Sequence, residues 1–215
     1  MEAQYRTVLE EASDEIEIKK SRFIGYAKPI ETEEEALEFI EHIKKKHRDA
    51  THNVPAYVVG ENNKVQRCND DGEPSGTAGV PMLEVLKKEN LRNVVVVVTR
   101  YFGGVKLGVG GLVRAYTKGA KAGLEAAKII EKVKLYAVKY KLDYSLLGKV
   151  DYEIEKGDIL LARKNYSEVV EVVLLSKEDE IENLNKLMAE WTQGQFDYEV
   201  LDENYYNIVD NKVII

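Results

Sequence analysis

The spacing of hydrophobic and polar residues predicts alternating strands and helices in the first part of the chain. Residues 5–12 (YRTVLEEA) and 15–30 (EIEIKKSRFIGYAKPI) alternate apolar and polar positions, which is typical of the two strands of a hairpin. Residues 32–50 carry an apolar face at helical spacing. Thr32, with Glu35 three positions later, is a helix-start signal. This part therefore begins with a hairpin followed by an amphipathic helix.

A run of valines marks the centre of the first part. Residues 93–100 (NVVVVVTR) are β-branched and bounded by polar residues, so they predict a buried central strand. Residues 54–61 predict a short strand, and residues 79–89 predict a helix with Pro81 in its first turn, where a missing N–H costs little. Residues 110–130 predict the last helix of this part.

The second part of the chain has the order strand, helix, strand, strand, helix, strand. The six segments are residues 134–144, 145–157, 159–166, 168–176, 177–194 and 196–209. This order is the split βαβ pattern of a ferredoxin-like sandwich. We therefore predict an α+β protein of two domains, an N-terminal α+β sandwich at residues 1–132 and a C-terminal ferredoxin-like βαββαβ domain at residues 133–215.

The distribution of charge agrees with two domains. Residues 133–215 hold 10 basic and 17 acidic residues, so they carry the whole net charge of −7, and residues 1–132 are neutral. No proline- or serine-rich linker marks the join. An acidic chain repels nucleic acid unless its acidic part faces away from the contact.

Composition predicts a cytoplasmic protein without a membrane partner. The longest apolar run, residues 94–98, is far shorter than the ~20 residues of a membrane-spanning helix. The first residues (MEAQYRTVLEE) lack the pattern of a secretory signal. Cys68 is the single cysteine, which excludes an internal disulfide and fits a reducing compartment. We interpret its thiol as a spectator.

Residues 99–123 (TRYFGGVKLGVGGLVRAYTKGAKAG) contain no acidic residue although the chain is acidic. Their glycines join the central strand to a helix, where backbone N–H groups at the positive helix end bind anions. Neither glycine pattern of the nucleotide-binding loops is present. The alternative role of the glycines is tight turns and packing, which we favour for Gly119 and Gly123. The predicted phosphate- or nucleic-acid-binding residues are Arg100, Tyr101, Gly103, Gly104, Lys106, Gly108, Gly110, Gly111, Arg114 and Lys118.

Three carboxylates lie close together in residues 68–81 (CNDDGEPSGTAGVP). Asp70, Asp71 and Glu73 are the type of ligand that Mg²⁺ prefers, often together with substrate phosphates. The same segment contains ordinary turn formers, and Ser75 or Thr77 is placed to cap the following helix. The turn interpretation is the stronger of the two, and a magnesium site stays open as the alternative.

His52 is the one histidine that we keep as a candidate. It precedes a predicted strand and lies at no metal-ligand spacing from another histidine, and we interpret His42 and His47 as surface residues of a lysine-rich helix. An enzyme would need His52 as its base, because the sequence offers no other convincing one. The candidate site residues besides the glycine-rich loop are His52, Asp70, Asp71, Glu73 and Ser75.

Two long motifs carry a resemblance to a known family. Residues 70–79 (DDGEPSGTAG) and 94–116 (VVVVVTRYFGGVKLGVGGLVRAY) resemble the IMPACT family, specifically its bacterial YigZ-type members. Residues 19–30 (KKSRFIGYAKPI) and 50–57 (ATHNVPAY) are similar to the early segments of that family. This chain has Val54 where we expect cysteine in many relatives, which argues against thiol chemistry at that position.

The resemblance implies a fold for each domain and a role in translation. The first domain is expected to share the α+β fold of a small-subunit ribosomal protein and of the fourth domain of elongation factor G. The second is expected to resemble the fifth domain of elongation factor G. Eukaryotic IMPACT proteins regulate translation initiation by interfering with the activation of an initiation-factor kinase, whereas the bacterial members have no firmly established reaction.

Three functions remain open at this point. The leading one is a translation-associated regulator that binds RNA or the ribosome through the basic glycine-rich face, with Tyr101, Phe102 and Tyr116 as stacking candidates. We favour core packing for Phe102 and Tyr116. The second is a Mg²⁺-dependent enzyme acting on a phosphorylated small molecule or nucleotide, and the third is a regulator that contacts a translation factor. Nothing indicates DNA specificity, and enzymatic activity and oligomeric state stay open.

Overall fold

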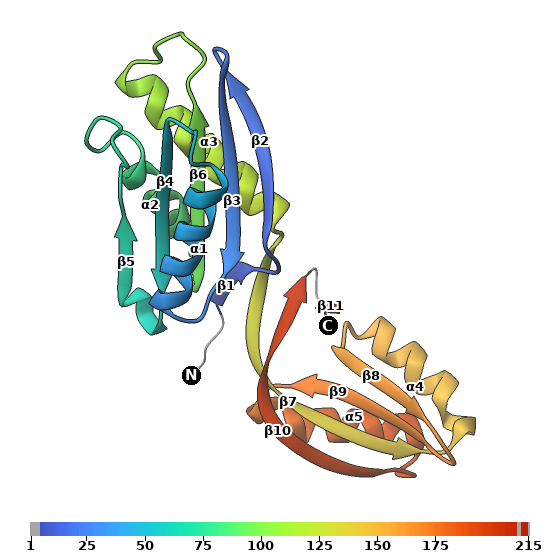
Figure 1. The fold of residues 1–215 in the computed structure, drawn as a ribbon. Coiled ribbons are helices and arrows are strands. Elements are labelled where there is room, and N and C mark those ends of the chain that lie inside the picture. Colours follow the sequence, from blue (N-terminus) through green and yellow to red (C-terminus); the bar gives the residue numbers. More distant parts are fainter. Residues whose placement is uncertain (1–4, 210–211, 215) are drawn as a thin grey trace. The chain divides into compact units, whose positions relative to one another are not determined.

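The structure is a computed structural model that describes residues 5–209 and 212–214. The chain divides into two compact units, residues 5–130 and the residues from 131 onward. Each unit combines strands with helices, so the predicted two-domain α+β architecture is confirmed (Figure 1). The chain passes from the first unit to the second within the long strand β7 (Ile129–Leu142).

The N-terminal unit is built on an antiparallel sheet with the strand order β2-β3-β6-β4-β5. Its elements are β1 (Tyr5–Val8), β2 (Ala12–Ile18), β3 (Ser21–Pro29), α1 (Glu33–Lys46), β4 (His52–Val59), the short 3-10 helix η1 (Glu61–Asn63), β5 (Val65–Cys68), α2 (Gly79–Lys88), β6 (Val94–Tyr101) and α3 (Val109–Ala126). Thr32 caps α1 as predicted, because its hydroxyl accepts the N–H of Glu35.

The valine run forms the central strand β6, as predicted. Val94, Val96 and Val98 lie in a core shared with α2 and α3, whereas Val95 and Val97 lie in a second core against α1. Successive side chains of a strand point to opposite faces, so a strand with helices on both faces is apolar at every position. The two cores of this unit explain why the run does not alternate.

The predicted hairpin was placed wrongly. Its strands are β2 and β3, and its turn lies at Lys19 and Lys20, both of which have positive φ angles (48° and 64°). Apolar and polar positions alternate on both sides of these lysines, and the sequence has no Asn-Gly or Asp-Gly pair there. The turn was therefore not recognised from the sequence. The last helix also ends earlier than predicted, at Ala126, and β5 was not predicted.

Helix α3 lies unusually close to strand β3. A Cβ atom added at Gly25 would stand 1.9 Å from the carbonyl oxygen of Gly119, and one at Gly123 would stand 2.7 Å from the backbone of Gly25. Only glycine permits this approach between two backbones. The packing role predicted for Gly119 and Gly123 is therefore confirmed.

The second unit has the strand order β10-β7-β9-β8 with antiparallel neighbours, which is the ferredoxin-like arrangement predicted from the sequence. After β7 its elements are α4 (Tyr144–Lys156), β8 (Leu161–Tyr166), β9 (Val170–Ser176), the short 3-10 helix η2 (Glu178–Glu180), α5 (Ile181–Thr192), β10 (Asp197–Val209) and β11 (Lys212–Ile214). Strand β11 extends the sheet beyond β10. Helices α4 and α5 cover one face of the sheet around Tyr140, Leu174 and Trp191. In the described part of the chain, every helix is too short or too polar to cross a bilayer.

Candidate functional site

A buried ion pair lies beneath the segment that holds the three carboxylates. Glu73 Oε1 accepts hydrogen bonds from Arg100 Nη1 at 2.5 Å and from the Tyr116 hydroxyl at 2.7 Å. The side chains of Glu73 and Arg100 are only 3% and 7% exposed. Burial, together with the hydrogen bond to Glu73, raises the pKa of Tyr116 well above its ordinary value, so its hydroxyl stays protonated as a donor. Glu73, Arg100 and Tyr116 thereby connect the loop at residues 69–78 with strand β6 and helix α3.

This pairing corrects the role predicted for Arg100. A guanidinium that is enclosed and bound to a carboxylate does not face a phosphate in solution, so Arg100 is not part of the exposed basic face. Tyr116 is fully buried, as favoured from the sequence. Both residues hold the loop at residues 69–78 against the sheet.

Asp70 caps helix α2. Its carboxylate accepts the backbone N–H groups of Gly76, Ala78 and Gly79 at 2.7 to 3.1 Å. Partial burial raises the pKa of Asp70, but these three hydrogen bonds outweigh it and leave the pKa below its ordinary value. The capping role predicted for Ser75 or Thr77 is wrong, because Ser75 is exposed and the Thr77 hydroxyl donates to the carbonyl of Pro74.

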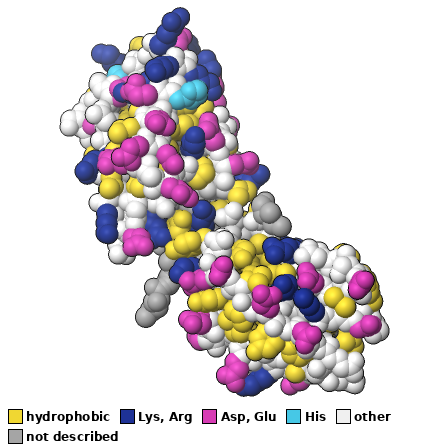
Figure 2. Space-filling model, turned by 60° about the horizontal axis from the view of Figure 1, so that its bottom comes forward, with side chains coloured by type: hydrophobic (Ala, Val, Ile, Leu, Met, Phe, Trp, Pro, Cys, Tyr) yellow, Lys and Arg dark blue, Asp and Glu magenta, His cyan; other side chains and the backbone are white. Residues whose placement is uncertain are grey.

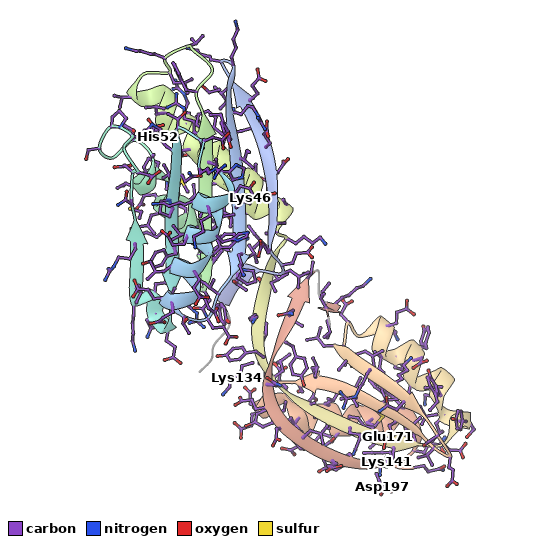
Figure 3. The ribbon with its side chains drawn as sticks, viewed as in Figure 1. Lys46, His52, Lys134, Lys141, Glu171 and Asp197 are labelled. Atoms are coloured by element: carbon purple, nitrogen blue, oxygen red, sulfur yellow. The ribbon has the colours of Figure 1, made fainter. Side chains whose placement is uncertain are left out.

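Asp71 and His52 fasten the same loop to strand β4. Asp71 Oδ2 accepts the N–H of Asn53 at 2.6 Å, and Asp71 Oδ1 lies 3.1 Å from Lys44 Nζ. His52 Nδ1 is 2.7 Å from the carbonyl oxygen of Asp71, so this nitrogen is the donor, and Nε2 is 3.7 Å from Glu73 Oε1. Figure 3 places His52 beside the loop in the N-terminal unit. The structure therefore brings His52, Asp71 and Glu73 together.

The carboxylates do not converge on a common point. Asp70 faces the start of α2, Asp71 faces β4 and Lys44, and Glu73 faces Arg100. Among the residues that the structure describes, no group of three or more His, Cys, Asp or Glu side chains is arranged to hold a metal ion. The donor set therefore lacks the clustered, open carboxylates that a Mg²⁺ site uses, and the turn interpretation explains the segment.

Two aromatic residues, Tyr101 and Phe102, lie where β6 meets the glycine-rich loop. Tyr101 shares His47 with Tyr26: the Tyr101 hydroxyl lies 2.8 Å from His47 Nδ1, and the Tyr26 hydroxyl lies 2.6 Å from Nε2. His47 is thus a bridging residue rather than a surface residue, and burial lowers its pKa. Phe102 is 47% exposed, so it does not pack in the core as we favoured.

The glycine-rich loop lies against the turn of the β2–β3 hairpin (Figure 1). The N–H of Gly103 donates to Ser21 Oγ at 3.1 Å, and a Cβ atom at Gly103 would stand 1.9 Å from the carbonyl oxygen of Lys20. Gly104 and Gly108 have positive φ angles of 83° and 69°. Helix α3 begins after Gly108 without a side-chain cap. Glycine is thus required here by backbone approach and by turn geometry.

The hairpin turn, the glycine-rich loop and helix α3 each contribute bases to what we call the basic pole: Lys19 and Lys20, Lys106, and Arg114 and Lys118. Within the described residues these five side chains make no ion pair, whereas Arg100 and Lys121 pair with Glu73 and Glu89. Lys106, Arg114 and Lys118 are exposed. Figure 2 shows Lys and Arg side chains gathered at the top of the N-terminal unit. The sequence prediction missed Lys19 and Lys20, and the doubled lysine before Ser21 was the only signal.

The pole also exposes apolar side chains and backbone. Phe102, Val105 and Val109 are 47%, 41% and 66% exposed. Gly110 and Gly111 stand in the first turn of α3, at the positive end of the helix dipole. This part of the surface therefore combines exposed apolar side chains with bases for which the described residues supply no ion-pair partner.

Comparison with known proteins gives the same division of the chain. Residues 19–124 match the family described as the Impact N-terminal domain, and residues 141–195 match a family described as a domain of unknown function, DUF1949. The chain is 50% identical over 193 residues to IMPACT family member YvyE of Bacillus subtilis, covering 90% of this chain and 89% of the relative. It is 31% identical over 189 residues to IMPACT family member YigZ of Escherichia coli, covering 87% and 93%.

A solved structure agrees with these matches. A crystal structure described as that of a hypothetical protein is 29% identical, covers 95% of this chain and 100% of that chain, and has a TM-score of 0.58. The two family matches follow one another in the order of the two structural units. Both motifs lie within the first match. Residues 70–79 form the loop that contains Glu73, and residues 94–116 form β6, the glycine-rich loop and the start of α3. This chain belongs to the IMPACT family.

Proposed function

We propose that the protein is a translation-associated regulator that acts in the cytoplasm and binds RNA through the basic pole of its N-terminal unit. Membership of the IMPACT family supports a role in translation, because the resemblance to that family implies regulation of initiation by its eukaryotic members. The observation that carries the RNA proposal is the set of unpaired bases around the glycine-rich loop, because phosphate contacts dominate the affinity for nucleic acid.

The exposed side chains of the pole suit a single strand. Phe102 offers a ring face to a base, and aromatic stacking is tolerant of sequence. Lys106 and Arg114 offer charge to the phosphates on either side. The alternative partner of the same pole is the ribosome or a translation factor. Two acids of the loop at residues 69–78 are already engaged, Glu73 with Arg100 and Asp70 with the start of α2.

The test is a titration of labelled oligouridine RNA with the full-length protein at several salt concentrations. The variant Lys106→Ala/Arg114→Ala removes two bases of the pole. Since each phosphate contact on a single strand contributes ~0.7 to the logarithmic salt slope, we expect the slope to fall by about 1.4 along with the affinity. The matched control is Lys64→Ala/Lys88→Ala, which removes two exposed lysines near the other end of β6.

Phe102→Ala separates stacking from charge. We expect it to weaken RNA binding by about 1 kcal/mol or more, as for a lost base–aromatic stack, while the salt slope stays the same. Absence of binding at low salt, or an equal loss in Lys64→Ala/Lys88→Ala, would remove RNA as the partner. A ribosome or a translation factor bound through the pole would then be tested with the same variants.

A further inference from the structure

The imidazole ring of His52 is held in one orientation against the loop that contains Glu73. Its Nδ1–H donates to the carbonyl oxygen of Asp71 at 2.7 Å. A Cβ atom added at Gly72 would stand 3.4 Å from the Cε1 and Nδ1 atoms of the ring, so the glycine backbone lies directly against the imidazole. The hydrogen bond at Nδ1 fixes the tautomer, and the neutral ring therefore carries its lone pair on Nε2.

The Nε2 atom of His52 faces a carboxylate that already accepts two hydrogen bonds. Glu73 Oε1 lies 3.7 Å from Nε2 and accepts from Arg100 and from the Tyr116 hydroxyl. Nε2 of the neutral ring and Oε1 are both acceptors, so they form no hydrogen bond with each other. Among the residues that the structure describes, none donates a hydrogen bond to Nε2. The His52 side chain is 18% exposed, so a ligand has access to the ring.

The ring also lies next to Phe102, the residue proposed to stack on a base. In the antiparallel pair of β4 and β6, His52 stands directly opposite Arg100, so their side chains share one face of the sheet. The Cζ atom of Arg100 is 5.5 Å from the centre of the Phe102 ring. The N–H of Phe102 donates to the hydroxyl of Thr51, the residue before His52, at 3.0 Å. Phe102 and His52 are therefore both neighbours of the same guanidinium.

We infer that His52 makes the protein selective for ribonucleotides, because its Nε2 accepts a hydrogen bond from a ribose 2′-hydroxyl. This selectivity rests on the proposed RNA binding at the basic pole. A base stacked on Phe102 brings its sugar toward the start of β4, where His52 stands. Arg100 already balances the charge of Glu73, so the donor that suits this position is neutral rather than cationic. The 2′-hydroxyl is such a donor, and it is the group by which a protein distinguishes RNA from DNA.

The test compares two labelled oligonucleotides of equal length with the full-length protein, oligouridine and its 2′-fluoro analogue. The analogue keeps the bases, the phosphates and the sugar conformation of RNA but has no 2′-hydroxyl to donate. We expect wild type to bind oligouridine roughly two- to tenfold more tightly, which is the effect of one hydrogen bond. Equal affinity for the two oligonucleotides overturns the inference and leaves the proposed function standing. Absence of binding to both overturns the proposed function and the inference with it.

Two substitutions assign the preference to His52. In His52→Asn the side-chain amide takes the place of Nδ1 and donates to the carbonyl oxygen of Asp71, but no atom reaches the position of Nε2. His52→Phe keeps a ring against Gly72 and lacks both nitrogens. We expect both variants to bind the two oligonucleotides equally, with the affinity that wild type has for the 2′-fluoro analogue. The matched control is His42→Asn, which makes the same change at an exposed position of α1 and should keep the preference.

Folding is measured in parallel by urea unfolding followed by circular dichroism, and a variant that does not fold is set aside in favour of the other. A folded His52→Asn or His52→Phe protein that keeps the preference for oligouridine overturns the role of His52. An equal loss of affinity for both oligonucleotides also overturns it, because a purely structural role weakens binding without changing the ratio of the two affinities.

Discussion

The two units of this protein differ in which of their charged side chains are paired. In the N-terminal unit Glu73 pairs with Arg100 and Asp70 accepts hydrogen bonds at the start of α2, whereas the bases of the pole make no ion pair with the described residues. In the C-terminal unit the lysines of the sheet are paired with acids, as Lys139 is with Glu199, and the unit keeps an acidic excess. Net charge alone does not tell which charges a surface presents, because pairing decides it.

The pairs also differ in burial, and therefore in what they contribute. The side chains of Glu73 and Arg100 are 3% and 7% exposed, whereas those of Glu199 and Lys139 are 61% and 21% exposed. Breaking a buried pair leaves an uncompensated charge in a medium of low polarity. Solvent screens an exposed pair, so its loss changes stability little.

The largest expected effect follows from the buried pair. Glu73→Ala should lower the free energy of unfolding by roughly 3–5 kcal/mol, because Arg100 and the Tyr116 hydroxyl lose their common acceptor. Urea unfolding followed by circular dichroism measures it. The control, Glu199→Ala, breaks the exposed pair of the other unit and should leave stability nearly unchanged.

The same experiment examines whether residues 1–132 and 133–215 behave as separate domains. Trp191 fluorescence follows only the C-terminal unit, so its unfolding midpoint should not move in Glu73→Ala. A shift of the Trp191 midpoint equal to that of the circular dichroism signal would show one cooperative transition instead of two. A loss below about 1 kcal/mol would contradict the buried-pair argument itself.

The second effect concerns the contact between α3 and β3. Gly25→Ala should cost about 1–3 kcal/mol or more, because its Cβ atom would stand 1.9 Å from the Gly119 carbonyl oxygen and both groups belong to backbone. Urea unfolding of the N-terminal unit measures the loss. Gly76→Ala is an instructive comparison, since no atom lies within 4 Å of its added Cβ and any loss there reflects its φ of 74° alone.

The third effect depends on pH. Asp70→Ala should cost about 1 kcal/mol near neutral pH by removing the cap of α2. The pKa of Asp70 is lower in the folded protein than its ordinary value of 3.8, so the carboxylate contributes stability above that value and loses it as the pH falls through the folded pKa. The difference between wild type and variant should therefore shrink in strong acid. A difference that is independent of pH would contradict the charged cap.

The smallest effect is a gain and belongs to the C-terminal unit. Gly148 lies inside helix α4 with no atom within 4 Å of its added Cβ. Gly148→Ala should therefore stabilise this unit by roughly 0.5–1 kcal/mol, because alanine loses less conformational freedom than glycine in a helix. The Trp191 midpoint measures it. A destabilised variant would mean that the exposed face of α4 is covered in solution.

Many features of the fold could be predicted from the sequence because they depend on local periodicity. The valine run predicted β6, since five consecutive β-branched residues suit a strand enclosed on both faces. Thr32 and Glu35 predicted the start of α1, and the order of six segments predicted the ferredoxin-like unit. The hairpin turn was missed, because Lys19 and Lys20 adopt positive φ angles that neither residue favours by itself.

The candidate site was predicted only as a set of residues. The sequence by itself determined that carboxylates, glycines and bases occur at residues 70–79 and 99–123, and that an acidic segment follows. The tertiary structure alone decided that Glu73 neutralises Arg100, that Asp70 caps α2, and that Lys19 and Lys20 join the basic pole. The physical reason is that a charge is exposed or cancelled by neighbours from distant parts of the chain, and 27 residues separate Glu73 from Arg100.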